Sequence, residues 1–100
     1  MIVDAHAHIE GLPGCEWLDP PELMVRLMDE AGVSRAIVMT YVDAPGDFGD
    51  YDPISYVAEA MKQFPDRLLG FARLDPGAGT AAQELLIRCV EQLSFKGLNL

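Results

Sequence analysis

The chain contains two histidines, His6 and His8, which lie two residues apart in an apolar run near its start. Successive side chains of a β-strand point to opposite faces, so the two imidazoles share one face. Residues at this spacing are about 6.5 to 7 Å apart along the strand, and both rings can reach one ion at about 2.1 Å. The spacing therefore predicts a two-histidine metal site.

Asp4 falls on the same face, two residues before His6. A carboxylate at this position can accept a hydrogen bond from an imidazole N–H and fix its tautomer, or approach the metal itself. The pair is also compatible with core histidines whose N–H groups are satisfied, because HxH arises often by chance. A polar stripe within an apolar strand is costly unless something satisfies it, and this favours the metal site.

The elements that would position these residues alternate along the chain. Each strand-like segment is short, apolar and rich in β-branched or aromatic residues. Such segments occur at 2–9, 35–41, 67–74 and 95–100. Helix-like segments with apolar stripes separate them, at 19–32, 52–65 and 80–93.

The helix-like segments carry recognisable start and stop residues. Asp19 can cap the first helix, with Pro20 in its first turn and Glu22 completing a capping box. Gly32 is expected to end this helix in the left-handed conformation. Asp52 is expected to begin the second helix in the same way as Asp19 begins the first.

The order β-α-β-α-β-α-β, with right-handed crossovers, predicts an α/β fold with a parallel sheet and helices outside it. A doubly wound open sheet and a (β/α) barrel both use this order. Neither GxGxxG nor GxxxxGK[ST] follows any of the strands, so the nucleotide-binding form of the open sheet lacks its usual support.

The composition narrows the classes of partner. Seven Lys and Arg stand against sixteen Asp and Glu, giving a net charge of −9 without a basic cluster, so we expect neither nucleic acid nor a membrane as partner. Cys15 and Cys89 lie too far apart for a CxxC motif, which suits a reducing compartment. No signal peptide and no apolar run of about 18 to 20 residues is present, so we expect a cytoplasmic protein.

Four segments carry a resemblance to a known family. MIVDAHAHI resembles the first strand of the amidohydrolase superfamily. LMDEAGVSRAIVMTY, FPDRLLGFARLDP and FKGLNL are similar to the second, third and fourth strand regions of its amidohydrolase-related (amidohydrolase 2) branch. The resemblance implies a TIM-type (β/α)8 barrel with its site at the C-terminal ends of the strands. Residues 1–100 would be the N-terminal part, strands one to four, of a single barrel domain.

The resemblance also implies a ligand set and a function. His6 and His8 match the metal pair of strand one, whereas the remaining ligands and the catalytic Asp come from strands beyond Leu100. It implies a divalent metal, with zinc as the first expectation, and a small-molecule substrate. The expected reaction is hydrolysis of an amide, ester or lactone by a metal-activated water, and nonoxidative decarboxylation is the second expectation. The catalytic residues are not identified, and the 100 residues alone are expected to be inactive.

A different class of function stays open. The chain would then be a non-catalytic βα half barrel that assembles into a homo-oligomer or binds a partner. A half barrel exposes the edges of its first and fourth strands, and exposed edges promote association. Such a module would need no further metal ligands and would show no activity with added zinc.

Single residues outside the histidine pair support further predictions. Arg73 could bind a substrate carboxylate in bidentate fashion or form a structural ion pair with Asp75 or another acid. Tyr41 could line the pocket or pack as a half-buried ring. Residues 42–52 have the length of a cover over the site. Cys15 could approach an ion or be a small loop residue, and Lys96 matches a lysine of the family's KGL pattern.

Overall fold

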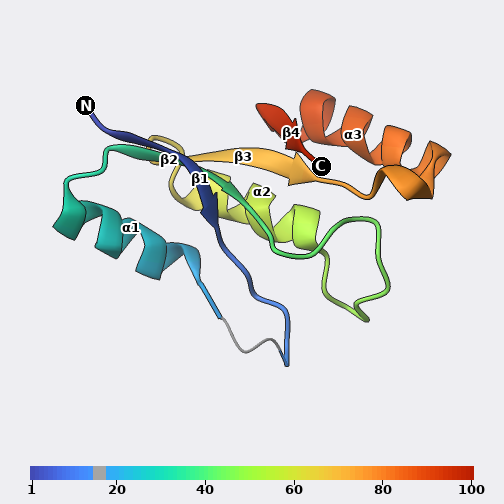
Figure 1. Ribbon diagram of the computed structural model, residues 1–100, viewed down its shortest axis with the longest axis horizontal. Coiled ribbons are helices and arrows are strands. Elements are labelled where there is room, and N and C mark those ends of the chain that lie inside the picture. Colours follow the sequence, from blue (N-terminus) through green and yellow to red (C-terminus); the bar gives the residue numbers. More distant parts are fainter. Residues whose placement is uncertain (15–17) are drawn as a thin grey trace.

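The computed structural model describes residues 1–14 and 18–100, so the predictions for Cys15 lie outside the described residues. Strands and helices alternate along the whole described chain (Figure 1). They are β1 (Val3–His8), α1 (Pro21–Ala31), β2 (Arg35–Met39), α2 (Pro53–Gln63), β3 (Leu68–Arg73), α3 (Thr80–Gln92) and β4 (Gly97–Asn99). A short 3₁₀ helix, Pro76–Ala78, precedes α3. The predicted order of elements is confirmed.

The four strands form one parallel sheet in the order β1-β2-β3-β4. Because all strands run the same way, their carboxyl ends meet at one edge of the sheet. The register of β1 against β2 shifts between Asp4 and Ala7, so regular alternation is interrupted before His8. In the described residues, β1 and β4 each have a single neighbouring strand.

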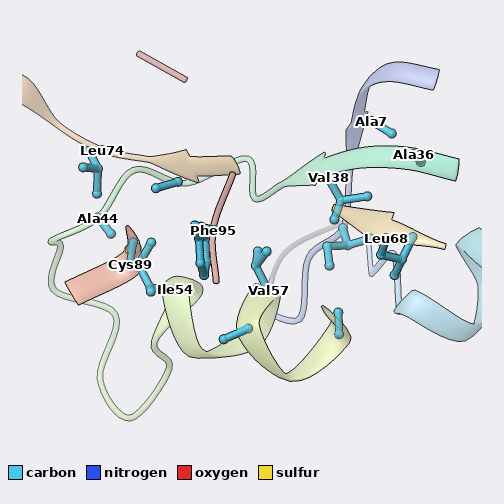
Figure 2. Close-up of a cluster of buried hydrophobic side chains, with 14 of the residues drawn as sticks. Ala7, Ala36, Val38, Ala44, Ile54, Val57, Leu68, Leu74, Cys89 and Phe95 are labelled. Atoms are coloured by element: carbon cyan, nitrogen blue, oxygen red, sulfur yellow. The ribbon is translucent and has the colours of Figure 1, made fainter. Parts of the chain in front are cut away.

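The hydrophobic core lies between the helices and one face of the sheet. In β3 the alternate residues Leu68, Gly70 and Ala72 are buried, whereas the residues between them are only partly buried. Figure 2 shows core side chains from strands and helices together, among them Val38, Leu68, Ile54, Val57, Cys89 and Phe95. The opposite face of the sheet, which carries His8 and Arg73, is therefore the open one.

Helix α2 packs closely on β3 because β3 contains a glycine at the contact. A Cβ at Gly70 would lie 2.7 Å from the methyl group of Met61 and 2.9 Å from a methyl group of Val57. The missing side chain thus allows the helix and the strand to approach. Arg73 is the last residue of the same strand.

The helix ends confirm two of the three predicted caps. Gly32 ends α1 with φ 74°, and the Asp52 carboxylate accepts a hydrogen bond from the Ile54 N–H at 3.0 Å. The predicted capping by Asp19 is wrong, because α1 begins after Pro20 without a side-chain cap. The Asp19 carboxylate instead accepts a hydrogen bond from the Tyr41 hydroxyl at 3.1 Å. None of the helices in the described ranges has the length and apolar character of a membrane span.

Candidate metal centre

The two imidazoles predicted to bind metal face each other at the C-terminal end of β1. Their Nε2 atoms are 3.1 Å apart, and the ring planes meet at 73°. Two nitrogen ligands, each about 2.1 Å from a divalent ion, lie roughly 3.0 to 3.4 Å apart for angles from octahedral to tetrahedral. The separation of the two Nε2 atoms therefore fits a shared metal ion.

A backbone carbonyl sets the tautomer of His8. Its Nδ1 lies 3.2 Å from the Thr40 carbonyl oxygen, which lies just after β2. Because a carbonyl oxygen only accepts, Nδ1 must carry the proton of this hydrogen bond, and in the neutral ring Nε2 keeps its lone pair. A ligating histidine is commonly oriented by such a bond from its other ring nitrogen.

The surroundings also favour the neutral form of His8. Burial lowers its pKa below the ordinary value, and the positive charges of His6 and Arg73 act in the same direction. The hydrogen bond to Thr40 and the Glu10 carboxylate oppose this shift. Neutral imidazole is the form that binds metal, so His8 is in the required state near neutral pH.

Asp4 contacts the histidine pair through the backbone. Its Oδ1 accepts a hydrogen bond from the His6 N–H at 3.0 Å, in the stretch where the register of β1 shifts. The carboxylate thus fixes the main chain at His6. Its predicted contact with an imidazole N–H or a metal stays a prediction.

Tyr41 lies against His8 and closes one side of a pocket. The two rings stack with their centroids 4.4 Å apart and their planes 14° from parallel. The pocket has a volume of about 320 Å³ and opens beside β1. Its lining combines polar and apolar side chains: Asp4, His6, His8, Asp19 and Tyr41, with Leu23, Met24 and Leu27 from α1. Of the two alternatives for Tyr41, the structure favours pocket lining.

Arg73 ends β3 and forms an ion pair. Its Nε lies 2.6 Å from Oδ1 of Asp43, and the two side chains are 29% and 47% exposed. The acid is therefore Asp43, whereas Asp75 accepts a hydrogen bond from the Gly77 N–H at 2.9 Å. A role for Arg73 in binding substrate stays a prediction.

Sequence reasoning missed one residue of the site, Glu10, which is fully buried. Its Oε1 accepts hydrogen bonds from the backbone N–H groups of Tyr41 at 3.1 Å and Val42 at 3.3 Å. Its Oε2 accepts a hydrogen bond from the Tyr51 hydroxyl. Glu10 lies beyond the last residue of β1, next to the buried Ile9, so strand alternation gave no signal for it.

Residues 1–14 and 18–100 contain no cluster of three or more His, Cys, Asp or Glu side chains arranged to hold a metal. The donor set visible in these ranges is the histidine pair. A complete coordination shell would need further ligands.

Comparison with solved structures shows which proteins the chain resembles. At 30% identity and a TM-score of 0.65, it matches 2,6-dihydroxybenzoate decarboxylase from Rhizobium, over 97% of this chain and 37% of that one. At 28% identity and a TM-score of 0.66, it matches dihydroxybenzoic acid decarboxylase from Polaromonas sp. JS666, solved with bound manganese and the inhibitor 2-nitroresorcinol, over 97% and 37%. No protein-family model matches the chain.

A third match shows the fold alone. 4-Oxalomesaconate hydratase from Rhodopseudomonas palustris is 18% identical, with a TM-score of 0.65 over 100% of this chain and 41% of that one. The two decarboxylase matches confirm the resemblance to the N-terminal part of the amidohydrolase-related family. They also confirm the fold class, the first four strands of a TIM-type (β/α)8 barrel. The chain spans about 37% of the length of the two decarboxylases.

Proposed function

We propose that the chain is the N-terminal part of a single barrel domain whose enzyme depends on a divalent metal and acts on a small molecule. Hydrolysis of an amide, ester or lactone is the first candidate reaction. The observation that carries the proposal is the pair of Nε2 atoms of His6 and His8, 3.1 Å apart at the carboxyl end of β1. When bound, a divalent ion polarises a carbonyl group or lowers the pKa of a water molecule.

Residues of this chain would hold and orient the reacting groups. His6 and His8 would bind the ion through Nε2, and Thr40 would keep the His8 ring in place through its carbonyl oxygen. Arg73 would bind a substrate carboxylate with the guanidinium N–H groups that its bond to Asp43 does not use. Arg73 and His8 are both partly buried on the open face of the sheet. Burial lowers the pKa of His8, and the Arg73 charge lowers it further.

Metal analysis tests this proposal directly. The full-length protein is loaded with zinc or with manganese in separate samples, and bound metal is measured by elemental analysis. A variant carrying both His6→Ala and His8→Ala should lose most of the metal, and its hydrolytic activity with it. The control is Glu91→Gln, which removes an exposed carboxylate of α3 outside the pocket. Equal metal content in the double variant and the control would refute the histidine site.

Nonoxidative decarboxylation is the second candidate reaction. The similarity to two dihydroxybenzoate decarboxylases, at 28 and 30% identity, favours it. Arg73 would then hold the carboxylate that leaves as carbon dioxide. Incubating the metal-loaded full-length protein with dihydroxybenzoates, and separately with lactones and esters, distinguishes the reactions. Release of carbon dioxide supports decarboxylation, and appearance of the hydrolysed acid supports hydrolysis.

A further inference from the structure

The Glu10 carboxylate joins three segments that are distant in the sequence. Glu10 follows β1, its two backbone donors Tyr41 and Val42 follow β2, and Tyr51 lies in the segment before α2. The Gly11 N–H donates in turn to the Tyr51 hydroxyl at 3.3 Å. A fully buried carboxylate is expensive unless it is hydrogen-bonded, and here three donors satisfy it.

The backbone that Glu10 holds is the backbone that contacts His8. Thr40, whose carbonyl accepts from His8 Nδ1, directly precedes the two N–H groups bound by the carboxylate. Tyr41, whose N–H is one of these donors, also stacks its ring on His8. Both contacts that orient the imidazole therefore depend on where the carboxylate places this short stretch.

We infer that Glu10, supported by Tyr51, is a positioning residue of the metal centre. By holding residues 41–42, it keeps the Thr40 carbonyl at Nδ1 of His8, so that Nε2 stays unprotonated with its lone pair toward His6. This inference rests on the proposed function, and it adds two residues that would not touch the metal. Tyr51 also ties part of the predicted cover, residues 42–52, to the end of β1.

Four variants distinguish a role of Glu10 in positioning His8 from a role in the stability of the fold alone. Glu10→Ala removes the acceptor, whereas Glu10→Gln retains an amide oxygen for the two N–H groups. Tyr51→Phe removes the hydroxyl that donates to the carboxylate. Tyr56→Phe is the matched control, since its ring lies near Tyr51 but its hydroxyl makes no hydrogen bond to the described residues. Circular dichroism checks that each variant folds.

The first readout is the tautomer of His8 in the metal-free full-length protein. Two-bond ¹H–¹⁵N correlation spectra of the imidazoles report which ring nitrogen carries the proton. We expect protonated Nδ1 in the wild type, Glu10→Gln and Tyr56→Phe, and a mixture of tautomers in Glu10→Ala. An unchanged tautomer in Glu10→Ala would overturn the inference. Should Glu10→Ala not fold, Tyr51→Phe replaces it: we expect a smaller shift toward the mixture of tautomers there, and an unchanged tautomer would overturn the inference.

The second readout is the dissociation constant for Co²⁺, followed by its visible absorption. Loss of an outer hydrogen-bond partner of a ligand weakens metal binding by roughly 10- to 100-fold, and this is expected for Glu10→Ala, with about 3- to 10-fold for Tyr51→Phe. Glu10→Gln should recover most of the affinity. Equal affinities in all variants would overturn the inference. Absence of Co²⁺ binding by the wild type would instead refute the proposed metal site, while the tautomer spectra still test the role of Glu10.

Discussion

The imidazole of His8 stacks on the phenol ring of Tyr41, with centroids 4.4 Å apart and planes 14° from parallel. The stack joins the ends of two neighbouring strands, because His8 ends β1 and Tyr41 follows β2. The Tyr41 hydroxyl donates to Asp19, in the segment that leads into α1. One ring thus connects the end of β1 to the segment before α1 and limits the orientations open to the imidazole.

Replacing Tyr41 should weaken metal binding, and more so when both of its contacts, the stack on His8 and the hydrogen bond to Asp19, are removed. Tyr41→Phe keeps the stack and loses the bond to Asp19, whereas Tyr41→Leu loses both. An aromatic stack contributes about 0.5 to 1.5 kcal/mol beyond its buried area, so Tyr41→Leu should raise the Co²⁺ dissociation constant by roughly 2- to 10-fold. Titration of the full-length proteins measures this. Equal weakening by both substitutions would show that the hydroxyl matters and the stack does not.

Arg73 should act on substrate binding more than on turnover. Arg73→Lys keeps a positive charge but loses the planar bidentate donor, so we expect KM for a carboxylate substrate to rise with little change in kcat. Arg73→Ala should raise KM further. Steady-state kinetics of the metal-loaded full-length protein measure both constants. A fall in kcat with unchanged KM would contradict a role in binding the carboxylate.

Substitution of Asp43, the acidic partner of the Arg73 ion pair, gives a separate prediction. Asp43→Asn removes the charge that Arg73 meets at 2.6 Å. Because both side chains are partly exposed, at 29% and 47%, solvent screens the pair, and the cost should be about 0.2 to 1 kcal/mol. Urea unfolding measures this cost. A loss well above this range would show that the pair holds the fold together.

The pattern of elements was predictable because it depends on local properties. Short apolar runs rich in β-branched and aromatic residues predicted the strands. Gly32 marked a helix end by its left-handed backbone, and Asp52 marked a helix start by its side-chain carboxylate. The capping by Asp19 was wrong because its carboxylate has a partner, Tyr41, that is distant in the sequence. A local pattern cannot show that a tertiary contact competes for the same side chain.

The same limit applies to the candidate site. Spacing placed His6 and His8 on one strand, but their orientation depends on Thr40 and Tyr41, which only the pairing of β1 with β2 brings near. Glu10 was missed because an isolated glutamate at a strand end resembles a solvated surface residue. Its burial follows from donors about thirty to forty residues away, as the bonds from Tyr41 and Tyr51 show.

Gly97 should resist substitution because Phe71 occupies the space above it. The two residues are paired in the β3–β4 register, and a Cβ at Gly97 would lie 2.6 to 2.8 Å from atoms of the Phe71 ring. Gly97→Ala should therefore destabilise the protein by about 1 to 3 kcal/mol, the usual cost of overpacking. Adding Phe71→Leu should recover part of this loss. Urea unfolding of both single variants and the double variant tests the coupling, and strictly additive effects would contradict it.

We expect the free energy of unfolding to depend on pH in the alkaline range, because the buried Cys89 thiol titrates there. Burial raises its pKa from 9.0 to about 11, with Arg88 lowering it and Asp52 raising it. Between these values the unfolded chain releases the proton and the folded chain keeps it, so the free energy of unfolding falls as pH rises from 9 to 11. A shift of this size corresponds to about 2 to 3 kcal/mol at most.

Cys89→Ala removes the titrating group and should flatten the dependence in this window. The shorter side chain leaves a small cavity, which lowers stability by about 1 kcal/mol at every pH without changing the slope. Tyr51 and Tyr56, whose pKa values are also raised by burial, titrate in both proteins, so the difference between the two curves isolates the thiol. Urea unfolding across the window gives both curves, and parallel curves would show that the pKa of the Cys89 thiol is the same in the folded and the unfolded chain.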